Sequence, residues 1–313
     1  MNIDSSTSMS MAAAYPDRFP TRHAEQEHHH DGHRQHHHHR HRQGRPVARL
    51  HLLPGQTIAP DALIFNQTSV GGTISGDGPV ARIPYIKDGL DAAIVAEGTR
   101  ITETDPDLSE MYVHTHKIAI LTPVSNEAAD YTQTTSLIQA GMVKAITDKA
   151  DRLLLQGDEA GIKGLALTPD MVDAGDINAA TGLNPLLDAI GKVGDNGGSP
   201  TGIIMGYSTW ASLLKLTDRN DRPLIATDMA NSPTPAIYGI PIILNMQTPT
   251  GTILLNDNSQ VLSAASQAAV ATSDQAYFAN DSLAIRVTMR LGFGVLRPNR
   301  LARLTVNKTP AKQ

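Results

Sequence analysis

The clearest periodic signal in the chain is a run of apolar residues spaced about 3.6 residues apart between residues 125 and 157. Ser125 or Asn126 can cap the start of this run, Glu127 complements the helix dipole, and Gly157 supplies a stop. The pattern predicts a helix of about thirty residues, roughly 45 Å long at 1.5 Å per residue. A helix of that length is unusual in a globular protein and would serve as a spine.

Ahead of this helix, β-branched and alternating segments predict strands. Residues 80–86 lead outward, residues 92–95 continue in the same sense, and residues 111–121 return, so the region forms a long β-excursion. His114 and His116 lie two apart on the returning strand, which predicts that both point to one face. Two histidines are too few for a metal site, so we expect a solvated or interface face.

The segments on either side of the excursion and helix mix short elements without regular β-α-β alternation. Residues 47–67 are expected to be extended, because Pro54 and Pro60 break helices. Beyond the spine the patterns predict helices at 184–193 and 207–216, and strands at 202–205, 240–244, 252–255, 283–289 and 292–297. This mixture predicts an α+β fold rather than a doubly wound parallel sheet.

Composition narrows the class of protein further. Of 313 residues 40% are hydrophobic, but only 4% are aromatic and none is cysteine. Aliphatic side chains must therefore fill the core, and disulfides, thiolate metal sites and cysteine nucleophiles are excluded. No run approaches the ~18 apolar residues of a membrane span, and residues 1–20 do not resemble a secretory signal. We expect a soluble protein.

Charge sets the first fifty residues apart from the rest. The formal net charge of −5 combines +2 over residues 1–50 with −7 over the remainder, and ten of the 13 histidines lie between 23 and 41. Such a stretch buries too little apolar area to offset its ordering entropy, so residues 1–46 are predicted to be disordered. It could bind a divalent metal or act as a cationic tail as imidazoles protonate. An expression tag is the less favoured explanation, because the longest run holds four histidines.

Motifs that would indicate catalysis are missing from the sequence. A glycine cluster at 71–78 lacks the Lys-Ser/Thr ending of a phosphate-binding loop, and Asp173, Asp176 and Asn178 lack the carboxylate spacing of a calcium loop. The acidic stretch at 97–110 lies in a surface loop, where a raised pKa is not expected, so it is interpreted as a solvated or partner-facing surface. We therefore predict no enzyme activity, no cofactor and no metal site.

The order of these elements resembles the major capsid proteins of tailed bacteriophages, which share the Hong Kong 97-like fold. The segments that carry the resemblance are Val95 to Gly98 with Val124 to Glu127, Asp151 to Gly164, Tyr238 to Ile242, and Leu283 to Pro298. Together they cover about residues 80–305 in the family's order. The resemblance implies a disordered segment at 1–46, an N-terminal arm at 47–70, an extended loop at 71–110, a peripheral domain at 111–175 and 276–306 with the spine helix, an axial domain at 176–275, and a flexible tail at 307–313.

A protein of this family would be a structural shell subunit rather than a catalyst. The resemblance implies self-assembly into hexameric and pentameric capsomers of an icosahedral head that encloses double-stranded DNA. It implies a virion protein assembled in the host cytoplasm, without a membrane partner. Expected partners besides the chain itself are a scaffolding protein, a portal, the packaged DNA and a decoration protein. The leader is short and lacks helical periodicity, which favours a separate scaffold; whether it is cleaved is left open.

Contact residues follow from the same resemblance. The extended loop would lie over a neighbouring subunit, and its acids would meet basic groups such as Arg82, Arg100, Arg219 or Arg222. The candidate contact residues between subunits are Glu97, Arg100, Glu103, Asp105 and Glu110. If the N-terminal segment faces the interior, candidate contacts to scaffold or DNA phosphates are Arg34, His36, His37, His38, His39, Arg40 and Arg42. The alternative is a segment without an assigned role.

One departure from the family concerns covalent cross-linking. The founding member joins its subunits by a lysine–asparagine isopeptide bond that a buried glutamate assists. Lys87 lies in the loop and Asn280 or Asp281 falls near the asparagine's place, but Thr288 stands where the glutamate is expected. We therefore predict a non-covalent shell.

Two other functions remain as alternatives. An encapsulin-type nanocompartment shell shares the fold but encloses protein cargo, and residues 1–46 do not resemble a compact cargo-docking helix. A metal-binding protein that uses the histidine tract would take up metal in a fixed ratio and lose it when residues 23–41 are deleted.

Overall fold

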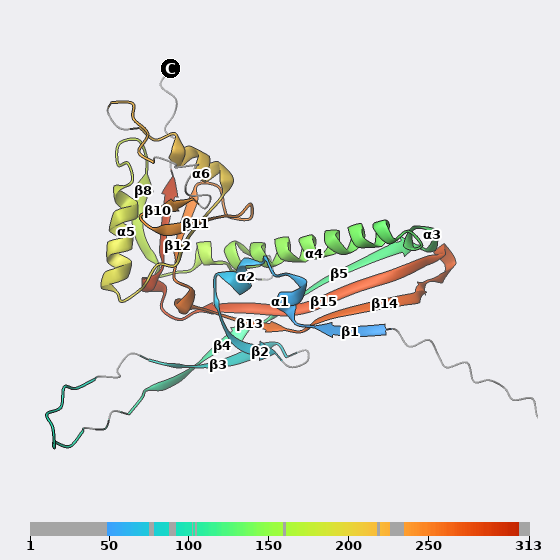
Figure 1. Cartoon of the computed structure of the whole chain (residues 1–313), viewed down its shortest axis with the longest axis horizontal. Helices are drawn as coiled ribbons and strands as arrows, with labels where there is room; N and C mark the ends of the chain where they lie inside the picture. Colours follow the sequence, from blue (N-terminus) through green and yellow to red (C-terminus); the bar gives the residue numbers. More distant parts are fainter. Residues whose placement is uncertain are drawn as a thin grey trace, which may run out of the picture. The chain divides into compact units, whose positions relative to one another are not determined.

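The computed structural model describes residues 49–74, 78–87, 92–101, 103, 105–158, 161–217, 220–225 and 235–306. The chain divides after Pro46 into two units, and the described residues all belong to the second, Val47–Gln313. The predictions for residues 1–46, Arg219 and the tail at 307–313 lie outside the described residues, and so do the candidate lumenal contacts from Arg34 to Arg42. The second unit mixes helices and sheets, as the α+β prediction requires (Figure 1).

The first of two six-stranded sheets joins segments from both ends of the second unit. Its strands run in the order β1 (Arg49–Leu53), β14 (Ala268–Tyr277), β15 (Ser282–Val295), β13 (Val261–Ser266) and β2 (Ser69–Ile74), and β5 (His116–Ser125) pairs with β15. The long strand β15 takes the places of the two strands predicted at 283–289 and 292–297. It is the central strand of the sheet, because β5, β13 and β14 all pair with it antiparallel.

The spine helix is shorter than predicted. Residues 126–129 form a separate turn, α3 (Asn126–Ala129), which Ser125 caps by accepting a hydrogen bond from the Ala128 N–H. The main helix, α4 (Thr132–Leu155), has 24 residues and begins after Tyr131, whose backbone is extended. α4 buries its apolar face in the main core, with Ile146 and Leu154 fully enclosed.

The segment predicted to be extended at 47–67 contains two one-turn helices instead. α1 (Gly55–Ile58) follows Pro54, and α2 (Leu63–Asn66) begins three residues after Pro60, so both prolines stand ahead of the helices and interrupt neither. Ala59, Ala62 and Ile64 are completely buried, so this segment packs into the main core rather than crossing the surface as an extended strand.

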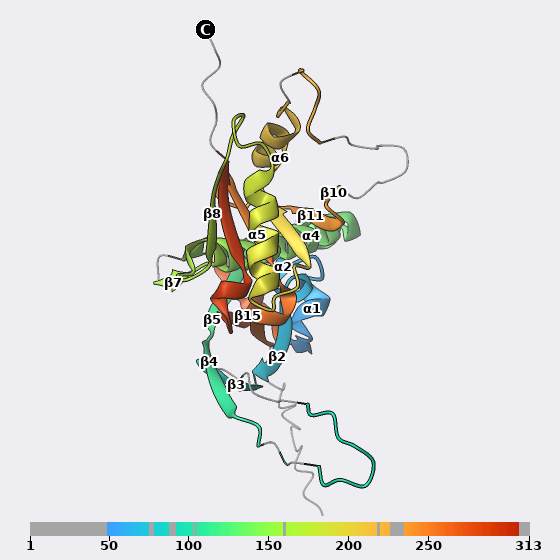
Figure 2. The ribbon, with the colours of Figure 1, turned by 90° about the vertical axis from the view of Figure 1, so that its left-hand side faces the viewer.

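The second sheet has its own core. Its strand order is β10 (Ala236–Ile237), β11 (Ile240–Leu244), β9 (Gly202–Met205), β12 (Thr252–Asn256), β16 (Ala302–Val306) and β8 (Val172–Ile177). The helices α5 (Asn184–Asp195) and α6 (Tyr207–Leu214) confirm the two predicted in this region. The core includes Leu186 of α5, Ile203 of β9 and Leu304 of β16, all essentially inaccessible. Figure 2 shows α5 running beside β8.

Strand pairing divides the chain differently from the predicted boundaries. β13 and β14 were assigned with residues 176–275, but they pair within the first sheet. β16 was assigned with the spine, but it lies between β12 and β8 in the second sheet. Both differences arise because these strands join partners far away in sequence, which local patterning does not report.

Shorter elements complete the described chain. They are β6 (Gly157–Asp158), β7 (Ile162–Lys163), η1 (Leu165–Leu167), η2 (Asn258–Gln260), η3 (Phe278–Asn280) and η4 (Pro298–Arg300). Within the part of the chain that the structure describes, none of the helices is long and apolar enough to cross a bilayer.

Candidate interaction surface

The predicted β-excursion is a hairpin that is a sheet of its own. β3 (Val80–Ile86) pairs antiparallel with β4 (Leu108–His114) over seven residue pairs, from Val80 opposite His114 to Ile86 opposite Leu108. Residues 92–95, predicted to continue the strand, are irregular. We call the region from Val80 to His114 the excursion. Figure 1 shows β3 and β4 leaving the end of the first sheet together.

Among the described residues of the excursion, the buried ones lie in its two strands. Ile83 of β3 and Val113 of β4 pack with Ile74, Leu262 and Ala264 in a small core of their own. The other positions of β3 and β4 are exposed or half-buried. A two-stranded sheet is marginal in water on its own, so this small core holds the hairpin in place.

Beyond its base the excursion exposes large aliphatic side chains. Ile94 is fully exposed, and Ile101 and Leu108 are 72% and 68% exposed. Burying one such side chain is worth about 1.5–3 kcal/mol. Exposed apolar side chains gathered in one region are typical of a surface that contacts a partner.

The far end of the excursion contains a tight turn. The N–H and the hydroxyl of Thr99 both donate to the Ala96 carbonyl, at 3.1 and 2.6 Å. Gly98 has a φ of +80°, a conformation that glycine adopts without strain. The turn therefore fixes the place of Glu97, the first of the candidate contact residues.

Glu110 forms a charged pair within the excursion. Its carboxylate lies 3.9 Å from the Arg82 guanidinium, which also stacks 5.4 Å from the centre of the Tyr112 ring. Glu110 and Arg82 were predicted to meet partners on another subunit, but here they pair with each other across β3 and β4. Both are largely exposed, and exposed pairs contribute about 0–1 kcal/mol.

The other candidate contact residues are separate from that pair. Glu97, Arg100, Glu103 and Asp105 are exposed along the irregular part of the excursion, and the structure does not gather them into one cluster with Glu110. Ile94, Ile101 and Leu108 were not singled out from the sequence, although they lie among these charged residues.

His114 and His116 do not share a strand face as predicted. The ladder breaks at Thr115, so His114 ends β4 and His116 begins β5. Nowhere in the described ranges do three or more histidine or acidic side chains gather as metal ligands would. The two aspartates considered above as calcium ligands form hydrogen bonds within β8 and with β16. Asp173 accepts from the Gly175 N–H at 3.0 Å, and Asp176 accepts from the Thr305 hydroxyl.

The positions compared with the family's cross-link have other partners. The Lys87 ammonium lies 3.4 Å from the Asp107 carboxylate, and both side chains are exposed. The Asp281 carboxylate accepts from the side-chain amide of Asn126 at 2.6 Å. Thr288 lies within β15, opposite Ala119 of β5 and Ala269 of β14.

One buried carboxylate was missed by sequence reasoning. Asp151 of α4 is only 4% exposed; it accepts from the Leu63 N–H at the start of α2 and from the Asn245 amide after β11, each at 2.7 Å. Burial raises the pKa of the Asp151 carboxyl, and these hydrogen bonds oppose the rise. Asp151 therefore joins three segments that are distant in sequence. The available signal was an acid three and four residues before Leu154 and Leu155, and so on the apolar side of the predicted helix.

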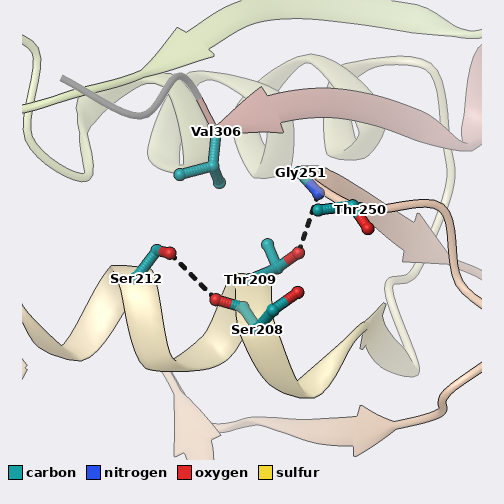
Figure 3. Close-up of a pocket in the computed structure, with 6 residues that line it drawn as sticks. All are labelled: Ser208, Thr209, Ser212, Thr250, Gly251 and Val306. Carbon is teal, nitrogen blue, oxygen red and sulfur yellow. Dashed lines mark hydrogen bonds between the residues drawn. The ribbon is translucent and has the colours of Figure 1, made fainter. Parts of the chain in front are cut away.

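A shallow hollow of about 300 Å³ lies beside α6 and the β12–β16 end of the second sheet (Figure 3). It is lined by Ser208, Thr209, Ser212, Thr250, Gly251 and Val306. The Thr209 hydroxyl accepts from the Gly251 N–H at 3.0 Å, and the Ser212 hydroxyl donates to the Ser208 carbonyl at 2.8 Å. Its lining carries no general base beside a hydroxyl, so the hollow does not have the groups of a nucleophilic site.

Comparison with known proteins finds a matching family and several similar solved structures. The model of the phage capsid family matches residues 62–306. No curated protein matches the chain. Similar solved structures include a chain from Mycobacterium phage Bobi, with a TM-score of 0.59 and 14% identity over 79% of this chain and 91% of that one. A chain from Gordonia phage Cozz has a TM-score of 0.61 and 16% identity over 79% and 87%. A chain described as "Capsid of empty GTA particle computed with C5 symmetry" has a TM-score of 0.60 and 15% identity over 79% and 90%.

Proposed function

Because this chain belongs to the phage capsid family, we propose that it is the major capsid protein of a tailed phage and assembles through hexamers and pentamers into an icosahedral head around double-stranded DNA. It is a structural shell protein that associates with copies of itself. The observation that carries the finer proposal is the excursion, whose exposed aliphatic side chains require cover that its own hairpin does not provide.

The proposed subunit contact is dominated by the aliphatic side chains of the excursion. Covering Ile94, Ile101 and Leu108 would supply roughly 4–9 kcal/mol per subunit before ordering costs. Exposed ion pairs supply about 0–1 kcal/mol each and weaken with salt. The acids Glu97 and Glu103 then select the orientation of the contact rather than supplying most of its free energy. Because each subunit repeats the contact, modest affinities add up to a closed shell.

The proposed shell is non-covalent. Isopeptide formation needs a neutral lysine amine and a base to accept its proton. The Lys87 side chain is engaged in an ion pair with Asp107, and Thr288 has no carboxylate to act as that base.

The proposed setting is the virion, with assembly in the host cytoplasm beside a scaffolding protein and a portal. Packaged DNA and a decoration protein are the further proposed partners. Candidate contacts of the N-terminal segment with scaffold or DNA are Arg34, Arg40 and Arg42 with the histidines between them. The similar structures named above come from phages and a GTA particle, which favours a phage head over the encapsulin-type compartment.

Negative-stain electron microscopy of the full chain, co-expressed with its scaffold and backed by light-scattering mass, tests the proposal. We expect closed shells or capsomers, fewer shells for I94S/I101S, and nearly normal yield for E97Q/E103Q at physiological salt. A chain that stays monomeric with the scaffold present would refute the shell proposal. Shell loss confined to the acid variant would instead refute the dominance of the aliphatic contact.

A further inference from the structure

The base of the excursion rests on β15 of the first sheet, at two positions where the strand has glycine and therefore no side chain. A Cβ placed on Gly292 of β15 would overlap the backbone carbonyl of His114 and would lie 3.1 Å from the Thr115 Cα. Two residues along the same strand, a Cβ on Gly294 would meet the Met111 sulfur at 2.6 Å. β4 therefore crosses β15 at backbone distance, and only glycine at 292 leaves room for that crossing.

Thr115 ties both strands of the excursion at this crossing. Its N–H donates to the Pro79 carbonyl and its hydroxyl to the Gly78 carbonyl, both at 2.8 Å. Its own carbonyl accepts from the Arg290 guanidinium at 3.0 Å. Thr115 is 5% exposed, so these hydrogen bonds are sheltered from water. The residues that enter β3 and leave β4 are thus fastened at one point to β15.

A second attachment lies at the other end of the hairpin ladder. The Arg297 guanidinium donates to the Ile86 carbonyl at 3.2 Å, on an exposed surface. Ile86 is the last residue of β3 in the ladder, opposite Leu108. The hydrogen bond from Arg297 to Ile86 is open to solvent, whereas the crossing at Thr115 combines three sheltered bonds with steric contact. The two attachments therefore differ in strength.

We propose that Gly292, Thr115 and Arg290 form a fixed joint that sets the direction in which the excursion leaves the first sheet, and that Arg297 is a weaker attachment that limits its swing. Arg290 and Arg297 are positioning residues. The joint stands on contacts within one chain; only its consequence, that the joint decides where the excursion meets a second copy of this chain, rests on the proposed function. Small changes at the joint are enlarged along a hairpin about 23 Å long.

Distances between spin labels on the unassembled full-length chain test the joint directly. The chain has no cysteine, so A96C near the tip and Q139C on the exposed face of α4 supply the only two thiols. We expect G292A to move the mean distance beyond the width of the parent distribution. The matched control G294A should leave it inside that width, because the Met111 thioether can rotate away. T115V and R290Q should broaden the distribution, and R297Q should broaden it less.

The outcomes separate the joint from the proposed function. Unchanged distributions for G292A and T115V would overturn the joint, whatever the shells look like. If G292A does not melt cooperatively, the distance distributions of T115V and R290Q test the joint instead, because neither substitution adds volume at the crossing. With scaffold present, we expect G292A to give shells of altered diameter or open sheets while G294A gives normal shells. If G292A shifts the distances but the parent chain never forms shells, the joint is supported and the shell proposal is refuted.

Discussion

Replacing the buried carboxylate of Asp151 should reveal how strongly α4 holds its neighbours. Asp151→Ala leaves the Leu63 N–H and the Asn245 amide without an acceptor inside the core. Each orphaned buried donor costs about 1–3 kcal/mol, so the free energy of unfolding should fall by about 2–6 kcal/mol. The exposed acid Asp148, one turn away and paired with Lys144 at 3.0 Å, gives the matched control D148N, with an expected change within about 0.5 kcal/mol.

The pH dependence of the isosteric variant D151N tests the cause of the effect. Burial raises the pKa of Asp151 in the folded chain above its unfolded value of about 3.9. The folded state therefore holds the proton more tightly, and this stabilisation is complete below the unfolded pKa. It is lost as pH rises through the folded pKa, so wild type should lose stability relative to D151N between about pH 4 and the folded value. The slope cannot exceed 1.36 kcal/mol per pH unit for one group.

Urea unfolding from pH 4 to 8, at one protein concentration below assembly, measures both effects. Parallel curves for wild type and D151N would refute the claim that a buried, ionisable carboxyl joins these segments. A wild type that gains stability over D151N with rising pH would refute its sign. Loss of stability in D148N equal to that in D151A would mean that acids on α4 act through general charge rather than through two specific hydrogen bonds.

Three further expectations can be checked quickly. Gly157→Ala should lower the melting temperature far more than Gly161→Ala. Both glycines have positive φ, but only a Cβ at 157 would overlap the Ile162 carbonyl. A thermal melt of the two variants therefore separates the steric cost from the conformational cost. Ser125→Ala removes the acceptor of the Ala128 N–H and should cost about 1 kcal/mol in urea unfolding. Assembled shells boiled in detergent should run as a single monomer band on a denaturing gel; a ladder of multimers would contradict the non-covalent shell.

The sequence predicted elements better than it predicted their partners. The helices at 184–193 and 207–216 and the strands at 202–205 and 240–244 were found, because each carries a complete local pattern. β13 and β14 were not assigned as strands; their Ala- and Ser-rich sequences have little hydrophobic alternation, and pairing with β15 decides their conformation.

The candidate surface was predicted in outline and misjudged in detail. Its place in the chain followed from the outgoing strand at 80–86 and its return, both of which the structure contains. The break at Thr115 was invisible, because Val113 to Ile120 has unbroken β propensity and only the crossing over Gly292 interrupts it. The acids drew attention because charge is conspicuous in a sequence, whereas the exposure of Ile94 depends on the absence of a second layer, which only coordinates reveal.

The first sheet also imposes an order of events on a growing chain. β2 pairs with β13, about 190 residues later in the sequence, and the excursion rests on β15, which ends at Val295. At roughly 5–20 residues per second on the ribosome, the excursion emerges about 10–40 seconds before its support exists. If the excursion meets a second copy of this chain, as proposed above, its direction for that contact is set only once β15 exists. On that proposal, completion of the C-terminal strands sets the earliest time for a productive encounter between subunits.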